Sequence, residues 1–417
     1  MKILLTGTYS SFNKGDAAME LSADAAFRRI AEADGGADGP VTVEILAPFP
    51  ERDGPFYAPT PVADCDRRRL IGASFGLVRA LLYRLLGRRP RALLNRSHRA
   101  TEAADLVVDL SGDMLTDAHG PHISISHYIP ILRGFILGKP VFICAQSIGP
   151  FRATRPLARR ILNRAAAVTV RDRISLDYLR GIGVTSAALE ETADMAFLLP
   201  AAPPARAAAL LAAEGILPEG GEDVLGVSVS GLVADRFDRH AGARGAFVAL
   251  MAEALGRVAA DHGLRLRFTP HVTGPKPDKD DRITSRAVRD ALPDPAIAEV
   301  IEADLRPEEM KAIIAQSTVF VGTRMHANIA ALSSHVPTVA IAYSHKTPGI
   351  MAGCGVEEFV IAAEALTVER LVERLEAALA ARAELSARLK RTVAAQAATA
   401  ARNVEIAARL IGAGGPP

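Results

Sequence analysis

Short runs of Val, Ile and Leu alternate along the chain with longer segments in which apolar residues recur at helical spacing. In the first half these runs cover residues 2–6, 41–47, 106–110, 140–145 and 167–170. A second series covers residues 224–230, 264–269, 298–301, 319–322 and 338–343. Such alternation is typical of β-α-β units, which build parallel sheets. The sequence therefore predicts an α/β protein with two doubly wound, Rossmann-like domains that face a cleft.

A change in composition separates the two series. Residues 200–223 contain four Pro and no strand-like run, which predicts an interdomain linker. We expect the N-terminal domain over residues 1–199 and the C-terminal domain over residues 224–362. The Ala-rich residues 363–411 predict C-terminal helices, and the Gly- and Pro-rich tail, residues 412–417, is expected to be disordered.

Composition narrows the class of protein. Hydrophobic residues make up 49% of the 417 residues and charged residues 23%, as in ordinary globular proteins, and the net charge of +2 does not favour a nucleic-acid partner. Three widely spaced cysteines exclude a disulfide framework and indicate a reducing, cytoplasmic location. The apolar start is too short for a signal peptide, and no stretch reaches 18 uncharged apolar residues.

Ligands of open parallel sheets bind beyond the C-terminal ends of the strands, so the loops there are where chemistry is expected. After the first run, Asn13, Lys14, Gly15 and Asp16 open a helix. Two interpretations stay open for Asn13 and Asp16. They cap the helix, or they line a cleft as polar ligands of a substrate.

Acids gather after the third run. Asp109, Asp113 and Asp117 recur at a spacing of four, and Ser111 precedes Asp113 beyond the strand end. Because no matching fourth ligand follows, we expect no metal site here. Three histidines come next and are expected in an exposed loop: His119, His122 and His127.

Polar groups also follow the next two runs. Gln146 comes directly after one, and Arg171 directly after the other. A guanidinium at a strand end can bind a carboxylate or phosphate through two hydrogen bonds. The alternative partner for Arg171 is Asp172 or another structural acid.

The strongest local pattern lies in residues 319–346. A strand ends there at Thr323, Arg324 and His326 open an apolar helix, and the next strand leads to Lys346. Cations beside a helix N-terminus make an anion site, most naturally for phosphate.

In this order the motifs resemble the polysaccharide pyruvyl transferase family over about residues 4–355. The matching motifs are residues 13–16, 111–113 with Asp117, 146–150, 171–172 with Ser175, 193–194, 324–327, 336–337, and Tyr343 with Lys346. The chain departs from the family pattern at residues 109–113, where a run of glycines is usual, and at Asn328, where the family is usually apolar.

The resemblance implies a fold like the two-domain GT-B glycosyltransferases. It also implies transfer of pyruvate from phosphoenolpyruvate to a sugar, commonly as a ketal. The N-terminal domain then holds the acceptor and the C-terminal domain the donor. Donor-site positions carried over are Arg171, Arg324, His326 and Lys346. No metal or organic cofactor is required, and three further acids are expected in a solvated loop: Asp278, Asp280 and Asp281.

Each residue type fits a part of that reaction. The cations bind the phosphate and carboxylate of phosphoenolpyruvate, and the His326 imidazole supplies a proton to its methylene carbon. Asp16 or Asp113 is expected to deprotonate the sugar hydroxyls. Further substrate-binding residues are expected at Asn13, Ser111 and Gln146.

Two other functions stay open. A GT-B glycosyltransferase would hold the diphosphate of a nucleotide sugar at the same cations, and a noncatalytic protein would bind a glycan or phosphate there without turnover.

Residues 67–99 are strongly basic. They contain ten Arg, no acid and an apolar face at roughly helical spacing. This pattern predicts an interfacial helix that attaches the protein to the inner face of the cell membrane. The alternative is a helix that packs on the N-terminal sheet with its Arg residues in solvent.

Overall fold

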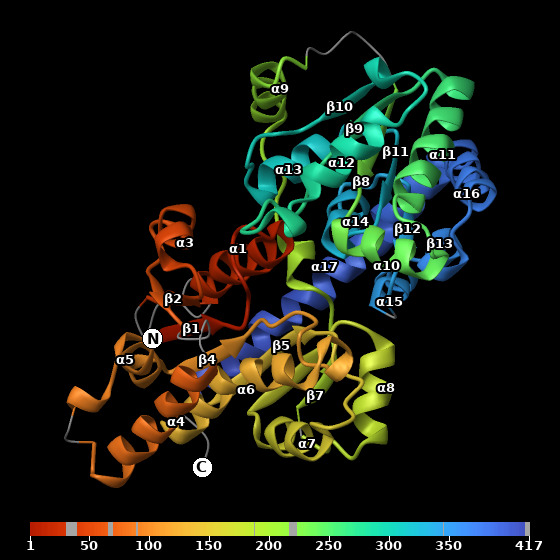
Figure 1. The fold of residues 1–417 in the computed structure, drawn as a ribbon. Helices are drawn as coiled ribbons and strands as arrows, with labels where there is room; N and C mark the ends of the chain where they lie inside the picture. Colours follow the sequence, from red (N-terminus) through yellow and green to blue (C-terminus); the bar gives the residue numbers. More distant parts are fainter. Residues whose placement is uncertain are drawn as a thin grey trace. The chain divides into compact units, whose positions relative to one another are not determined.

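The computed structural model describes residues 1–30, 40–65, 70–88, 91–186, 188–216, 223–344 and 346–412. The chain divides into two compact units (Figure 1). Unit 1 consists of Met1–Ser11, Met19–Leu198 and Ala397–Pro417, and unit 2 of Phe12–Ala18 and Leu199–Gln396.

Unit 1 is built on a parallel sheet of seven strands in the order β3-β2-β1-β4-β5-β6-β7. The strands are β1 Lys2–Thr6, β2 Thr42–Ala47, β3 Val62–Asp64, β4 Leu106–Asp109, β5 Val141–Gln146, β6 Ala167–Val170 and β7 Leu189–Glu191. Its helices are α3 Pro50–Tyr57, α4 Leu70–Leu85, α5 Arg96–Ala103, α6 Pro121–Ile136, α7 Arg155–Arg164 and α8 Arg173–Gly181. Two more helices belong partly to it: α1 Lys14–Arg28 and α17 Arg382–Gly412.

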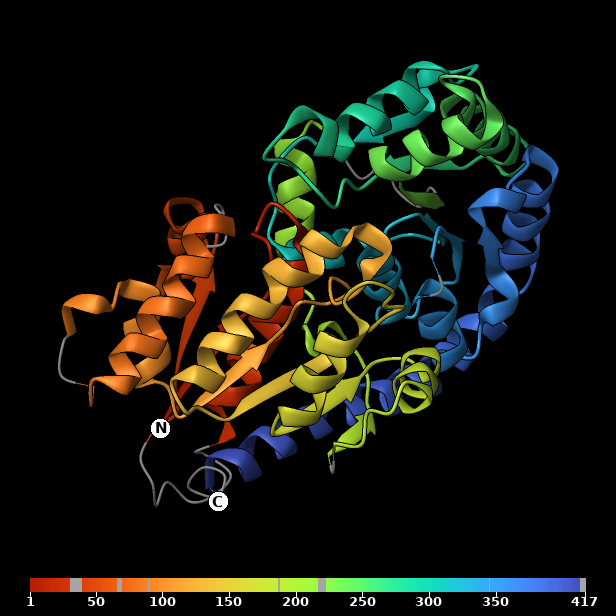
Figure 2. The ribbon, with the colours of Figure 1, turned by 60° about the horizontal axis from the view of Figure 1, so that its bottom comes forward.

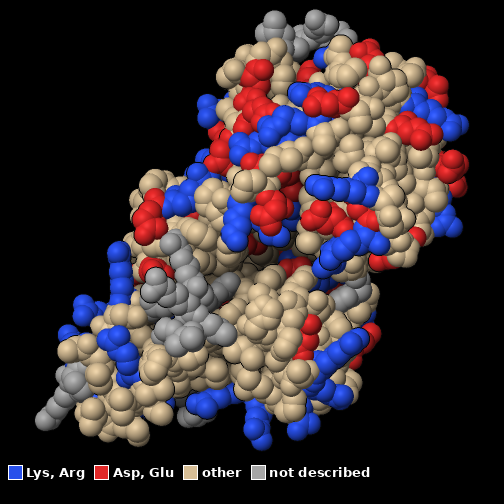
Figure 3. All heavy atoms as spheres, in the orientation of Figure 1, with Lys and Arg blue, Asp and Glu red and all other residues tan. Residues whose placement is uncertain are grey.

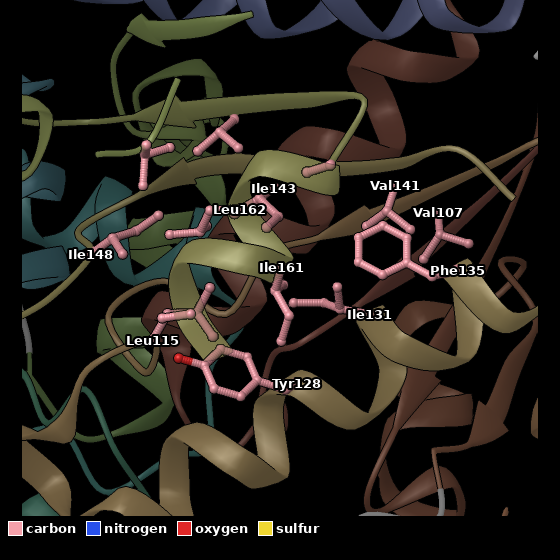
Figure 4. Packing of buried hydrophobic residues seen from close by; sticks show 14 of the residues in the cluster. Val107, Leu115, Tyr128, Ile131, Phe135, Val141, Ile143, Ile148, Ile161 and Leu162 are labelled. Atoms are coloured by element: carbon pink, nitrogen blue, oxygen red, sulfur yellow. The ribbon is translucent and has the colours of Figure 1, made fainter. Parts of the chain in front are cut away.

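Helices cover both faces of this sheet. In Figure 2, α6 and α7 lie in front of the strands and the end of α17 lies behind them. Figure 4 shows the front layer, where Val107 and Val141 of the strands pack against Phe135 of α6, with Ile161 of α7 nearby. Because the buried strands are apolar on both faces, they appear in the sequence as continuous hydrophobic runs.

Unit 2 repeats the arrangement with six parallel strands in the order β10-β9-β8-β11-β12-β13. They are β8 Val224–Ser228, β9 Arg265–Phe268, β10 Ala298–Val300, β11 Val319–Gly322, β12 Thr338–Ala342 and β13 Val360–Ala362. The helices are α9 Pro204–Ala213, α10 Gly231–Ala241, α11 Ala246–His262, α12 Asp281–Asp290, α13 Pro307–Ile314, α14 Met325–Leu332, α15 Lys346–Gly353 and α16 Val368–Ala380. The strand order reverses between β1 and β4 in unit 1 and between β8 and β11 in unit 2.

The predicted class, two doubly wound α/β units, is confirmed, and all ten apolar runs form strands. The sequence analysis missed β3, β7 and β13, which are edge strands of three residues each. Runs this short carry no periodicity that separates them from loops.

The predicted domain boundaries need correction. The presumed linker is part of unit 2 through residue 216, because Ala207 and Leu211 of α9 are buried in one cluster with Met310 and Ile313 of α13. Residues 217–222 and 413–417, which include most of the expected tail, lie outside the described residues. Residues 12–18 belong to unit 2 and the end of α17 to unit 1, so neither unit is one continuous segment.

Candidate active site

The N-terminal polar loop belongs to unit 2, where it lies beside the segment that follows β9. The Lys14 amide donates to the His271 carbonyl oxygen at 2.9 Å, and the Thr273 amide donates to the Phe12 carbonyl oxygen at 3.0 Å. The first turn of α1 is therefore fixed against the C-terminal edge of the unit 2 sheet.

Asn13 caps α1. Its Oδ1 accepts from the Gly15 amide at 3.0 Å, and its Nδ2 donates to Asp16 Oδ1 at 3.0 Å. The capping interpretation is confirmed for Asn13, and Asp16 is held by that cap. Both side chains are half-buried.

Gly15 lies directly against the His326 imidazole. A Cβ atom at Gly15 would stand 2.2 Å from His326 Nδ1 and 2.5 Å from its Cγ, so no other residue fits without displacing the ring. His326 is the second residue of α14, which begins beyond β11. Two motifs from distant parts of the sequence thus meet within unit 2.

Arg324 forms a two-pronged ion pair with Asp281. The Nε atom donates to Oδ2 at 3.0 Å and Nη2 donates to Oδ1 at 2.7 Å, with the carboxylate fully buried. Burial raises the pKa of Asp281, although Arg324 opposes the shift. The prediction that Asp281 lies in a solvated loop is therefore wrong. Asp280 caps α12, and Asp278 is largely exposed.

Two lysines add positive charge to this edge. Lys14 Nζ lies 2.5 Å from Asp304 Oδ1, and the Lys14 side chain is fully buried. Lys346 is buried and begins α15, just beyond β12.

His271 is one of the residues that the sequence analysis did not predict. It is 5% exposed, and its Nδ1 has no hydrogen-bond partner among the described residues. Its pKa is lowered to about 3, mainly because burial penalises the charged imidazole, and electrostatic interactions with His326, Arg324 and Lys14 contribute to that shift. The sequence signal that could have identified His271 is its position three residues after the end of β9.

Buried serine hydroxyls lie at the same edge. Ser228 Oγ and Ser230 Oγ have no hydrogen-bond partner in the described part of the chain, and both residues are at most 1% exposed. The Ser228 carbonyl oxygen accepts from the Thr323 amide at 2.8 Å. The end of β8 therefore lies beside Thr323, the residue that precedes Arg324. Both hydroxyls can therefore donate to a ligand that reaches this strand end.

In unit 1, Arg171 is paired with Asp194 rather than with Asp172. The Nη1 atom lies 2.5 Å from Asp194 Oδ2, Nε donates to Ser147 Oγ at 3.0 Å, and both charged side chains are fully buried. Asp172 instead caps α8 by accepting from the Ser175 amide at 2.7 Å. Arg171 Nη2 has no partner among the described residues.

Ser111 and Gln146 belong to a buried network in unit 1. Gln146 Nε2 donates to the carbonyl oxygen and to Oδ1 of Asp109, at 2.8 and 2.6 Å. Ser111 Oγ lies 2.9 Å from His127 Nδ1. His127 is therefore a buried residue of α6, against the expectation of an exposed loop, whereas His122 is exposed.

The acids after β4 have different surroundings. Asp113 is half-buried. Asp117 accepts from the Arg152 and Thr154 amides at 2.7 and 2.9 Å, and although burial raises its pKa, hydrogen bonds from Thr154, Arg152 and Ser124 leave that pKa lowered. Asp117 thus anchors the start of α7. Within the described ranges, no group of three or more His, Cys, Asp or Glu residues is arranged to hold a metal ion.

Comparison with known proteins decides the family. A model of the family described as polysaccharide pyruvyl transferase matches residues 13–345. The chain belongs to this family. It is also 23% identical over 296 residues, 69% of each chain, to the amylovoran biosynthesis protein AmsJ of Erwinia amylovora. The resemblance drawn from the motifs is confirmed, and the chain is a pyruvyltransferase of polysaccharide synthesis.

Solved structures share the fold of this pyruvyl transferase. The UDP-GlcNAc 2-epimerase from Neisseria meningitidis superposes with a TM-score of 0.60 at 10% identity, covering 98% of this chain and 100% of that one. A putative UDP-N-acetylglucosamine 2-epimerase from Listeria monocytogenes gives 0.59 at 14% identity, covering 96% and 94%. At such identities the likeness concerns the GT-B-like fold alone.

Proposed function

We propose that this pyruvyl transferase moves the pyruvyl group of phosphoenolpyruvate onto two hydroxyls of a glycan or lipid-linked saccharide, as a ketal, in the synthesis of cell-envelope polysaccharide. The basic edge of unit 2 is the observation that carries the proposal. Arg324, His326 and Lys346 lie there at strand ends, with Lys14 and His271 beside them. A donor with a phosphate and a carboxylate needs such a cluster of cations.

The donor is held by charge and by hydrogen bonds. Arg324 and Lys346 bind its anionic groups, and the unused hydroxyls of Ser228 and Ser230 supply further donors. Asp281 fixes the Arg324 guanidinium in one orientation through two hydrogen bonds. A cation held in advance loses less conformational entropy when the anion binds.

His326 acts as the general acid. It gives its proton to the methylene carbon of phosphoenolpyruvate, so a C–H bond forms and C2 becomes an oxocarbenium ion. One sugar hydroxyl adds to C2 and a second displaces phosphate, which leaves with the electrons of the broken C–O bond. Asp16 or Asp113 takes the hydroxyl protons. No metal or organic cofactor takes part in these steps.

The remaining predicted residues are assigned to substrate binding within their own units. Arg171 contributes through Nη2, because Asp194 and Ser147 occupy its other nitrogens. Ser111 and Gln146 bind the acceptor, and Gln146 Oε1 is a buried acceptor atom without a partner in the described residues. Asn13 acts near the donor by holding Asp16.

The enzyme is proposed to work in the cytoplasm, on the inner face of the membrane when its acceptor is lipid-linked. Its three cysteines, Cys65, Cys144 and Cys354, are free and buried, which suits a reducing compartment.

The test is turnover with a defined donor. The purified chain is incubated with cell-envelope saccharides and either phosphoenolpyruvate or nucleotide sugars, and phosphate release is followed by phosphorus NMR. We expect release that requires both phosphoenolpyruvate and saccharide and that persists in EDTA. Turnover only with a nucleotide sugar, or EDTA inactivation that magnesium or manganese reverses, would favour a glycosyltransferase. Donor binding without any turnover would favour a noncatalytic binding protein.

A further inference from the structure

One side of α4 carries an unusual number of exposed apolar side chains. Its inner side packs in a small cluster, where Ala80 and Tyr83 contact Leu94 and Leu137. Its outer side is open, with Phe75 67% and Leu85 71% exposed. The large apolar side chains exposed on α4 and at its end are Phe75, Val78, Leu81, Leu82, Leu85 and Leu86. Packing against residues 91–94 and the end of α6 therefore accounts for only one face of this helix.

The open side of α4 continues into a groove formed with α6 and α7. The groove has a volume of about 390 Å³, and its apolar lining includes Leu85, Leu132 and Leu157 from the three helices. Two arginines at its rim contact residues of α6. Arg84 Nη1 donates to the Ile136 carbonyl oxygen at 2.9 Å, and the Arg164 guanidinium lies 5.0 Å from the centre of the Phe135 ring.

Charge on these helices has one sign. Helix α7 carries four exposed arginines, α4 carries Arg79 and Arg84, and none of α4, α6 and α7 contains Asp or Glu. Figure 3 shows few acidic side chains over the part of unit 1 where these helices lie. Long basic side chains around an apolar surface match a partner with anionic heads and apolar tails.

We propose that α4, α6 and α7 form a docking surface for an anionic bilayer. The groove receives acyl chains, and Arg84, Arg160 and Arg164 contact the phosphate groups at its rim. Attachment is peripheral, because no helix in the described ranges is long and apolar enough to cross a membrane. The surface extends beyond residues 67–99, because α6 and α7 lie outside that segment. The proposal rests on the proposed function in one respect only, namely that attachment would bring the enzyme close to a lipid-linked acceptor.

Flotation of the full chain on vesicles tests this surface. Phosphatidylcholine vesicles with and without phosphatidylglycerol are compared at low and high salt. Wild type should float only with phosphatidylglycerol and less at high salt. The double variants Leu81→Asp/Leu85→Asp and Arg160→Glu/Arg164→Glu should each lose at least about tenfold in partitioning. The controls Ile283→Asp and Arg244→Glu, exposed in unit 2, should float like wild type.

The affinity for phosphoenolpyruvate, measured by calorimetry, should be unchanged in both groove variants, which shows that they are folded and separates this proposal from the donor assignment. Equal flotation on neutral vesicles, flotation of the groove variants like wild type, or no flotation of wild type would overturn it. A dimer in light scattering that Leu81→Asp/Leu85→Asp dissociates would overturn it as well, because a second copy would then cover the surface.

Discussion

The two sheets have the same strand order around the point where it reverses, but the side chains at their C-terminal edges differ in charge. At the unit 1 edge, Asp109 accepts a hydrogen bond from Gln146 and Asp194 accepts one from Arg171, the only cation among these four residues. At the unit 2 edge, Lys14 pairs with Asp304 and Arg324 pairs with Asp281. His326 and Lys346 lie in the first turns of α14 and α15, which begin beyond neighbouring strands. The same architecture thus carries more cations at the unit 2 edge than at the unit 1 edge, and the proposed division between donor and acceptor rests on this difference.

Loss of the proposed acid should have the largest effect on catalysis. His326→Gln should lower kcat by about 10²–10⁴ while the affinity for phosphoenolpyruvate stays close to wild type, because a general acid acts mainly in the transition state. Steady-state kinetics and calorimetry measure the two quantities. A variant with normal kcat would remove His326 from the chemistry.

Arg171 should matter strongly for folding, because its guanidinium is buried against the Asp194 carboxylate. Arg171→Ala leaves the Asp194 carboxylate buried without its cation, so the free energy of unfolding should fall by about 3–5 kcal/mol in urea denaturation. The control is Arg402→Ala, which breaks the exposed pair with Glu190 and should cost about 0–1 kcal/mol. Unchanged stability together with lost donor binding would contradict the contrast between the edges.

Gly15→Ala tests the contact between the N-terminal loop and the acid. The new Cβ atom would overlap the His326 ring, so the ring must move and kcat should fall roughly ten- to hundredfold. Gly54→Ala in α3 is the matched control, because its Cβ atom meets nothing within 4 Å. Equal kcat in the two variants would show that the ring position is not critical.

His271 should govern part of the acid sensitivity. The pKa of His271 is lowered from 6.5 to about 3 in the folded protein. Between these pH values the imidazole is protonated in the unfolded chain and neutral in the folded chain. The free energy of unfolding should therefore fall by up to about 1.4 kcal/mol per pH unit between pH 6.5 and about 3. In His271→Asn the fall should be shallower. Urea denaturation at a series of pH values measures the slope, and identical slopes would contradict a buried neutral imidazole.

Much of the fold, and the location of three cations at the unit 2 edge, could be predicted from the sequence. The long apolar runs predicted ten strands, and Arg324, His326 and Lys346 stood directly after two of them, so their location at one sheet edge followed from parallel topology. Asp281 and His271 were not predicted as site residues. Their surroundings depend on how α12 and the loop after β9 pack, which a one-dimensional pattern does not contain. The contact of Gly15 with His326 likewise joins residues that lie far apart in the sequence.

The central claim, that the basic edge of unit 2 binds the donor, is tested most directly by calorimetric titration of Arg324→Ala with phosphoenolpyruvate. The variant removes charge-assisted hydrogen bonds worth about 1.5–3 kcal/mol each, so affinity should fall roughly ten- to hundredfold. Arg206→Ala, which removes a largely exposed arginine from the same unit, should bind as wild type does. An unchanged affinity in Arg324→Ala would contradict the account.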